Sequence, residues 1–372
     1  MFIFKGGSRA VTRNRPHCLR RSYASRIEIP IPRSSNAIPT IESCPSPTCQ
    51  CQEMPSGLEI EREQNINGTM PSYAEQVLIS TGRSDWASKI ETEEEGVLVK
   101  RLKHFLGPKG KYSDPYHNVM LTNSSFAPTD PPASQRETSR KPSSDSGSVP
   151  VTKYGGNELA HSSEASPPAS AFLLPSFTYA PVIPTDAASV EALIKGYILP
   201  SQLHQSHDRL AREEKNVLLR QPETQRRIIG ARQINEILVL ICGHGGRDIR
   251  CGTLGPMLQQ EFERKLERQN IPILRDPPVA EAVEINTDVE GYSPTARVGL
   301  ISHIGGHKWA GNVIIYIPPS HKGNSLAGKG IWYGRVAPQD VEGIVTKTIV
   351  EGKVIKELFR GGIDRSREIT RL

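Results

Sequence analysis

The clearest pattern of apolar and polar positions lies in the C-terminal half of the chain. Residues 236–241 (EILVLI) form an apolar run that is typical of a buried strand and that leads directly into Cys242. Helices are predicted from about Thr253 and from about Pro338, where the spacing of apolar residues changes to that of a helix face. These elements indicate an α/β domain over residues 231–352. Its further strands are predicted at 282–285, 298–303, 313–317 and 331–335.

A weaker version of this pattern precedes it, over residues 66–203. Its strands are predicted at 76–82, 119–123 and 172–177, and its helices at about 91–106 and 186–199. Residues 124–169 are rich in Ser, Pro, Thr and charge and hold almost no large apolar residue. They are therefore predicted to be a disordered insertion in an N-terminal α/β domain. The highly charged residues 204–230 are predicted to form a surface helix or a linker.

Both halves follow one order: strand, Gly-containing loop, helix, strands, helix. The loop after the first strand reads TGRSD at 81–85 and CGHGGRD at 242–248. A degenerate tandem repeat, in which only the second copy kept potential ligands, would explain this order. Chance recurrence of a common α/β order would explain it equally well, so both explanations stay open.

The ends of the chain differ from these two halves. Residues 1–27 hold one Lys and six Arg without any acidic residue, a composition typical of a mitochondrial transit peptide. A basic disordered arm is the alternative. Residues 28–65 are rich in Pro and Ser and are predicted to be an irregular, Cys-containing segment. Residues 353–372 are expected to be a C-terminal tail.

Charge and hydropathy argue against two classes of function. The net charge is only +6 and much of the positive excess lies near the N-terminus, so nucleic acid is not an expected partner. No run approaches the roughly 18 apolar residues of a membrane-spanning helix, so no membrane span is expected. The sequence RSYA at 21–24 resembles a matrix-processing site. The mitochondrial matrix is therefore the expected location.

Two pairs of metal-ligating side chains follow predicted strands in Gly-rich loops. Eight residues separate Cys242 from Cys251 in CGHGGRDIRCG, and three separate His303 from His307 in HIGGHKWAGN. Thiolates suit iron–sulfur clusters or zinc, and imidazole suits either metal. Glycines allow backbone N–H groups to approach bridging sulfides closely. The sequence therefore predicts a metal centre held by two Cys and two His.

Other kinds of site that use Cys, His or Gly-rich loops fit this spacing less well. A structural Cys2His2 zinc site usually has about two to four residues between its cysteines, so zinc is the weaker alternative. A Rieske domain draws one Cys and one His from each loop, whereas this chain separates the two types. A Cys-based phosphatase needs Arg where Asp248 stands, and the domain holds no Cys-x-x-Cys. The stretch 243–246 is too short for a phosphate-binding glycine loop.

These two motifs, together with STGRSDW at 80–86, resemble those of the sucrase/ferredoxin-like family, and most of all its fungal mitochondrial branch. The resemblance spans roughly residues 40–350. It implies a thioredoxin-like [2Fe–2S] ferredoxin domain with bis-histidinyl ligation, preceded by a degenerate thioredoxin-like half. It also implies electron transfer or redox sensing with redox protein partners, rather than a classical enzyme. The cluster ligands of the family map onto Cys242, Cys251, His303 and His307.

Such a ligand set has expected consequences. Ordinary thioredoxin-like ferredoxins have Cys-x3-Cys where this chain has His-x3-His. Replacing two thiolates by imidazoles makes a cluster easier to reduce, as Rieske clusters (about −150 to +300 mV) compared with plant-type ferredoxins (about −400 mV) illustrate. The imidazole N–H groups can couple electron uptake to proton uptake. His244 is expected to support the loop or to be exposed rather than to be a ligand, and Trp309 is expected to pack beside the site.

Three further cysteines, Cys44, Cys49 and Cys51, cluster in CPSPTCQC. They indicate either an auxiliary thiol or metal site, or a flexible segment whose cysteines stay reduced. Two alternative functions follow for the chain. One is a structural zinc protein with an interaction role, and the other is a thiol oxidoreductase that uses these three cysteines.

Overall fold

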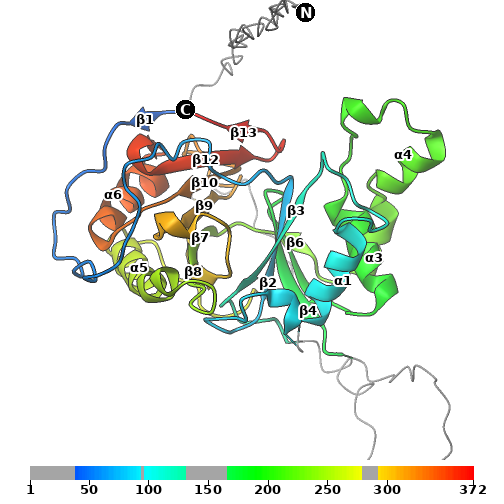
Figure 1. Cartoon of the computed structure of the whole chain (residues 1–372), viewed down its shortest axis with the longest axis horizontal. Helices are drawn as coiled ribbons and strands as arrows, with labels where there is room; N and C mark the ends of the chain where they lie inside the picture. Colours follow the sequence, from blue (N-terminus) through cyan, green and yellow to red (C-terminus); the bar gives the residue numbers. More distant parts are fainter. Residues whose placement is uncertain (1–37, 94–95, 131–165, 279–291) are drawn as a thin grey trace, which may run out of the picture. The chain divides into compact units, whose positions relative to one another are not determined.

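One mixed sheet of eleven strands runs through the part of the chain that the structure describes, residues 38–93, 96–130, 166–278 and 292–372 (Figure 1). The structure is a computed structural model. The strand order is β13-β12-β10-β9-β7-β8-β3-β2-β4-β5-β6. The expected transit peptide, most of the insertion expected at 124–169 and the strand expected at 282–285 lie outside the described residues.

The C-terminal half is a thioredoxin-like unit. Its four central strands have the order β10-β9-β7-β8, with β7 parallel to β8, β9 antiparallel to β7, and β10 antiparallel to β9. Along the chain, helix α5 follows β7, the first of these strands, and α6 follows β10, the last. The elements are β7 (Ile237–Cys242), α5 (Ile249–Arg268), β8 (Ala296–Ile301), β9 (Val313–Ile317), β10 (Lys329–Tyr333) and α6 (Val341–Ile344).

The N-terminal half repeats this topology. Its strands have the order β5-β4-β2-β3, with the same sequence of parallel and antiparallel neighbours, and helices again follow the first and last strands. The common order expected from the sequence is thus present in the tertiary structure. The elements are β2 (Glu75–Ser80), α1 (Val97–Leu106), β3 (Val119–Ser124), β4 (Ala169–Leu174), β5 (Thr178–Ile183) and α3 (Ala187–Leu193).

The two halves share their sheet and part of their core. They join where β3 pairs antiparallel with β8, at Ser124 and Ile301. Strand β7 is buried on both faces, which explains why its sequence is continuously apolar. Val239 packs in a core with α5 and α6. Its neighbour Leu240 packs in a second core that includes Phe172 of the first half.

Helix α5 begins earlier than predicted. The predicted start was Thr253, whereas the helix begins at Ile249 because the Asp248 carboxylate accepts a hydrogen bond from the backbone N–H of Arg250. An Asp in this role stabilises a helix start. Cys251 therefore lies in the first turn of α5 and not in the preceding loop.

The expected C-terminal tail is also different. Residues 353–372 contribute β11 (Val354–Ile355), β12 (Phe359–Asp364) and β13 (Ile369–Thr370), and β12 pairs with β10 inside the sheet. Strand β12 could not be predicted from its sequence, FRGGID, because two glycines and a buried Arg interrupt the apolar pattern. In the first half, β5 was not predicted either, because Pro181 interrupts its apolar residues. The strand predicted at 172–177 corresponds to β4, which ends at Leu174, before Pro175.

The remaining segments connect and cover these halves. The described part of the segment expected to be irregular, 38–65, is largely so, and its strand β1 (Thr40–Ile41) pairs parallel with β11. Several of its apolar side chains pack against the C-terminal core. The charged region 204–230 contains a short helix, α4 (Arg212–Leu218), and β6 (Arg232–Gln233) follows it. Among the described helices, none combines the length and apolar character needed to cross a membrane.

Candidate metal centre

The two predicted cysteine ligands meet where β7 passes into α5. Cys242 ends the strand and Cys251 lies in the first helical turn, and their exposed fractions are 2% and 1%. Both thiols are free and lie against each other. The Cys251 thiol holds the pKa of Cys242 well below its ordinary value, and Cys242 in turn raises the pKa of Cys251. The two sulfurs are therefore close neighbours, and cysteine sulfur binds metals as the thiolate.

The two predicted histidine ligands lie in the loop that follows β8. Because β8 is the parallel neighbour of β7, this loop leaves the sheet at the same edge as the cysteine loop. The rings of His303 and His307 have their centroids 5.5 Å apart. His303 also lowers the pKa of Cys242, as a neighbour in hydrogen-bonding contact. His303 is half-buried and His307 is exposed, so the pair extends from the buried sulfurs toward solvent.

The glycines of the cysteine loop have a packing role that the sequence did not predict. A Cβ atom on Gly252 would lie 2.6 Å from the Cα of Gly245, and one on Gly255 would lie 2.6 Å from the Cα of Gly243. Real Cβ atoms do not approach a backbone that closely. The first two turns of α5 therefore press directly against the loop that precedes them, and on the helix side of this contact only glycine fits.

His244 is buried and holds the two loops together. Its Nδ1 accepts a hydrogen bond from the backbone N–H of His303 at 2.9 Å. Its Nε2 lies 3.0 Å from the carbonyl oxygens of Trp86 and Ala87, to which the neutral ring can donate. The Asp85 carboxylate accepts hydrogen bonds from the N–H of Gly246. The STGRSDW segment of the first half thus supports the cysteine loop of the second.

Arg360, on β12, is a site residue that the sequence did not reveal. It is 1% exposed, and its guanidinium donates to the Asn312 side chain at 2.6 Å and to the Gly305 carbonyl oxygen at 3.2 Å. Its cation also faces the ring of Trp309, 5.2 Å from the centroid. Burial lowers the pKa of Arg360 to about 10, and the charge of Cys242 opposes this shift. The guanidinium thus braces the histidine loop and places a positive charge near the sulfurs.

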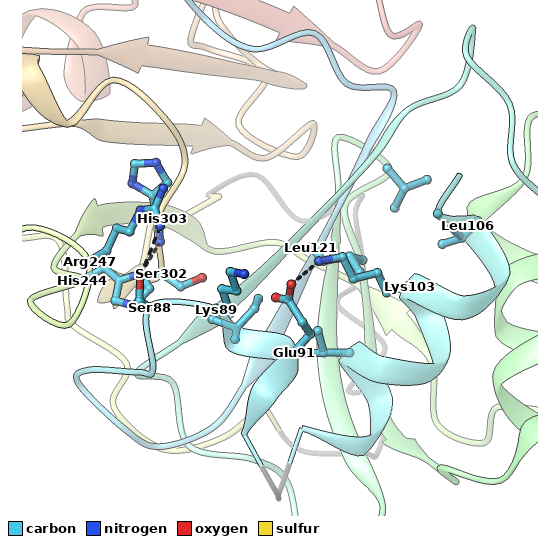
Figure 2. A pocket seen from close by; sticks show the side chains of 14 residues that line it. Ser88, Lys89, Glu91, Lys103, Leu106, Leu121, His244, Arg247, Ser302 and His303 are labelled. Carbon is cyan, nitrogen blue, oxygen red and sulfur yellow. Dashed lines mark hydrogen bonds and ion pairs between the residues drawn. The ribbon is translucent and has the colours of Figure 1, made fainter. Parts of the chain in front are cut away.

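A cavity of about 480 Å³ opens beside His303 and His244 (Figure 2). Its other wall comes from α1 and the preceding turn in the first half, where Glu91 and Lys103 form an ion pair. Arg247 also lines it. The half-buried imidazole therefore faces a cavity that both halves build, with charged side chains and apolar ones such as Val99 and Leu121 in its walls.

The donor atoms suit a cluster that takes its ligands in pairs. Within the described ranges, no three His, Cys, Asp or Glu side chains stand close enough together to hold a single metal ion. Two buried sulfurs and two imidazoles nevertheless converge on one edge of the sheet. Each iron of a [2Fe–2S] centre takes two protein ligands, as the paired Cys and His ligands of Rieske centres show. The buried cation Arg360 suits a centre whose thiolate ligands are negative.

The three cysteines of CPSPTCQC are not equivalent. The Cys44 thiol donates to the Asp340 carbonyl oxygen at 3.4 Å. Burial and the nearby carboxylates of Asp340 and Glu357 raise its pKa to about 12. Cys49 and Cys51 instead lie beside the ammonium group of Lys265. The structure therefore separates Cys44 from the other two.

The chain is similar to known proteins over most of its length. The family model described as sucrase/ferredoxin-like matches residues 66–361. Altered inheritance of mitochondria protein 32 of Meyerozyma guilliermondii is 26% identical over 87% of this chain and 95% of the relative. The protein of the same name from Debaryomyces hansenii is 28% identical over 87% of this chain and 96% of the relative.

Similarity is higher over a shorter stretch. The protein with that name from Clavispora lusitaniae is 47% identical over 128 residues, which is 34% of this chain and 36% of the relative. No solved structure matches the chain.

Proposed function

We propose that this chain, which belongs to the sucrase/ferredoxin-like family, is a mitochondrial electron-transfer or redox-sensing protein with a [2Fe–2S] cluster. Cys242 and Cys251 would hold one iron, and His303 and His307 the other. The observation that carries the proposal is the contact of the two buried thiols with each other and of His303 with Cys242. The cluster supplies a centre that accepts and releases one electron.

The surrounding residues suit this role. Both cysteines are buried in the core that the two halves share, so water is excluded from the sulfurs. The exposed imidazole of His307 offers the side from which a redox protein can approach. Arg360 places a fixed positive charge that favours the more negative, reduced state. Hydrogen bonds to His244 fix the backbone from which His303 projects, because orientation of a ligand depends on the groups behind it.

The relatives and the N-terminal composition support a mitochondrial location. The relatives carry mitochondria in their names, and the basic, acid-free residues 1–27 are typical of a transit peptide. We place the protein in the matrix on the resemblance of RSYA at 21–24 to a processing site.

The decisive experiment is metal and sulfide analysis with an absorption spectrum on protein purified without oxygen. The proposal requires iron and acid-labile sulfide in equal amounts and a brown protein whose colour bleaches on reduction. Zinc is the alternative metal, because it accepts the same donor types. Colourless protein that contains one zinc and no sulfide would replace the electron-transfer role with a structural one.

A further inference from the structure

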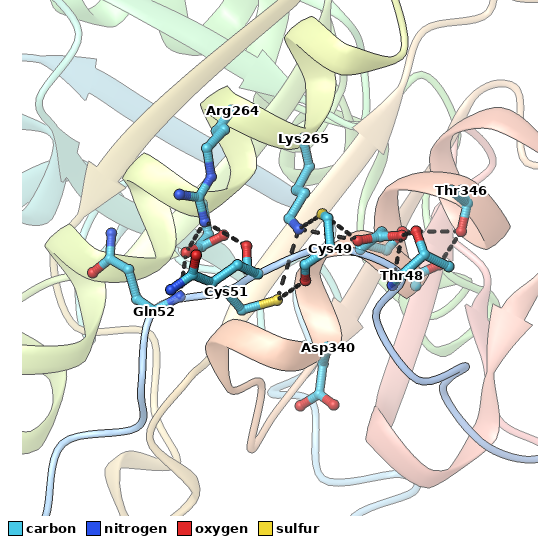
Figure 3. Close-up of polar contacts among 12 residues, drawn as sticks. Thr48, Cys49, Cys51, Gln52, Arg264, Lys265, Asp340 and Thr346 are labelled. Atoms are coloured by element: carbon cyan, nitrogen blue, oxygen red, sulfur yellow. Dashed lines mark hydrogen bonds and ion pairs between the residues drawn. The ribbon is translucent and has the colours of Figure 1, made fainter.

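A second group of reactive side chains lies away from the metal centre, where residues 44–52, here called the thiol strap, cross α5 (Figure 3). Lys265, on α5, donates from Nζ to the Cys49 Sγ at 2.5 Å. Cys49 donates to the Glu342 carboxylate, on α6, at 2.8 Å. Lys265 and Glu342 form an ion pair of 3.0 Å. A thiol, an ammonium and a carboxylate are thus in mutual contact.

A second sulfur belongs to the same group. Cys51 Sγ lies 3.7 Å from the same Lys265 nitrogen and 3.4 Å from the carbonyl oxygen of Cys49. Figure 3 shows both sulfurs directed toward the Lys265 ammonium. Two thiols one residue apart therefore share one cation.

The contact between Lys265 and Cys49 involves a buried cation. The Lys265 side chain is 2% exposed, although an ammonium loses favourable hydration when it is buried. Burial lowers the pKa of Lys265, but the hydrogen bonds with Cys49 and Glu342 raise it by more, so the net shift of the pKa is upward. A buried cation held against a sulfur stabilises the negative charge that the sulfur carries as a thiolate, the reactive form of cysteine.

Small oxidants can reach Cys49. A cavity of about 120 Å³ opens at this thiol, lined also by Thr48, Arg268 and Thr346. Its volume suits a small molecule such as a hydroperoxide. Cys49 is itself only half-buried. Cys44, on the same strap, contacts no cation of this group and has a raised pKa, so it serves as an internal reference.

We propose that Cys49 is a hydroperoxide-reactive thiol, that Cys51 is its resolving partner, and that Lys265 and Glu342 are positioning residues. The Cys49 sulfur attacks the hydroperoxide, so an S–O bond forms while the O–O bond breaks. The Cys49 proton ends on the departing oxygen, which leaves as an alcohol or water. Cys51 then attacks the resulting sulfenic acid, and an S–S bond forms as water leaves with the proton of Cys51. The two thiols lose two electrons, and the hydroperoxide gains them.

The test is treatment of the reduced full-length protein with hydrogen peroxide, followed by alkylation of the remaining thiols and peptide mass spectrometry. The wild type should yield a Cys49–Cys51 disulfide, visible as the loss of two hydrogens, while Cys44 stays alkylated. Cys51→Ser should instead accumulate a sulfenic acid on Cys49 that dimedone traps. These peptides report on the thiols whatever the state of the metal centre.

The role of Lys265 is tested by the pH profile of Cys49 alkylation. Lys265→Gln should slow alkylation near neutral pH by about tenfold and move its midpoint to higher pH, about one pKa unit per tenfold. Lys265→Arg should restore much of the rate if the variant folds, as circular dichroism will show. Thr346→Ala, which changes the same cavity without touching the sulfurs, is the matched control and should react like the wild type.

Three results would overturn the proposal. Cys49 that reacts no faster than Cys44 would make the strap structural. A product that joins Cys49 to Lys265 through one oxygen would remove Cys51 from the reaction. An unchanged pH profile in folded Lys265→Gln would show that the ammonium does not support the thiolate.

Discussion

The His244 ring accepts the backbone N–H of His303 at its Nδ1, over 2.9 Å. Its other nitrogen faces the carbonyl oxygens of Trp86 and Ala87 in the first half of the chain. One buried imidazole therefore links both ligand loops to the half that holds no expected ligands. Through this link the N-terminal half supports both candidate ligand loops.

Replacing His244 by Ala should weaken both the fold and the centre. Two buried hydrogen bonds are lost and a buried backbone N–H is left without its acceptor, which costs about 1–3 kcal/mol of unfolding free energy. Urea unfolding and iron per chain are the measurements, with the exposed His104→Ala as the control. Complete loss of iron at unchanged stability would instead identify His244 as a ligand.

Changing His303 and His307 together to Cys should keep a [2Fe–2S] cluster, since this is the Cys-x3-Cys spacing of thioredoxin-like ferredoxins. The added negative charge should lower the reduction potential by on the order of hundreds of millivolts. The pH dependence of the potential near neutrality should also largely disappear, because no ligand imidazole remains to titrate. Redox titrations at several pH values test this. An unchanged potential and slope would exclude these histidines as ligands.

Arg360→Gln should lower the reduction potential, because a fixed positive charge near Cys242 is removed. It should also destabilise the fold by about 1–3 kcal/mol, since buried oxygens of Asn312 and Gly305 lose a donor. Lys308→Gln is the matched control, because Lys308 is exposed and its ammonium lies over the same Trp309 ring, 4.7 Å from the centroid. A larger change of potential in the control would contradict the assignment.

His117 should make the fold sensitive to mild acid. Burial lowers its pKa from 6.5 to about 4, with the charges of Arg367 and Arg220 acting in the same direction and Asp114 against it. The unfolded chain therefore binds the proton more tightly, so stability is lost as the pH falls from 6.5 toward 4. The loss from this group amounts to about 3 kcal/mol.

The measurement is urea unfolding of the wild type and His117→Asn at pH 7 and pH 5. Stability should fall less between these values in the variant than in the wild type. Equal losses in the two proteins would show that His117 does not contribute.

Residues 1–27 should direct import and be removed on arrival, because basic and acid-free segments of this kind are recognised by the mitochondrial import machinery. A fluorescent reporter fused to this segment tests it, with Arg20 and Arg21 changed to Glu as the control. A reporter that stays uncut in the cytosol would refute the prediction.

The sequence alone determined the features that depend on local order. The apolar run of β7 and the Gly-rich loops after β7 and β8 show where these strands end, and so place Cys242 and His303 at strand ends. This could be predicted because a strand is recognised from the pattern of consecutive side chains. The order of elements shared by the two halves was predicted in the same way, whereas the thioredoxin-like fold was implied by the resemblance to the sucrase/ferredoxin-like family. The sequence also placed Cys49 and Cys51 next to each other, but without a partner.

Only the tertiary structure decided which distant groups surround these residues. Lys265 is 216 residues from Cys49 along the chain, and Arg360 is 48 residues from Asn312. Such contacts arise when helices and strands bury their apolar faces together. This packing brings distant polar groups into contact, and no local sequence pattern predicts which groups will meet. The Asp248 cap, by contrast, is a contact between near neighbours in the sequence: its carboxylate accepts from the backbone N–H of Arg250, and the helix therefore includes Cys251. Local periodicity therefore determined where the candidate ligands lie along the chain, and tertiary packing determined which distant side chains surround them.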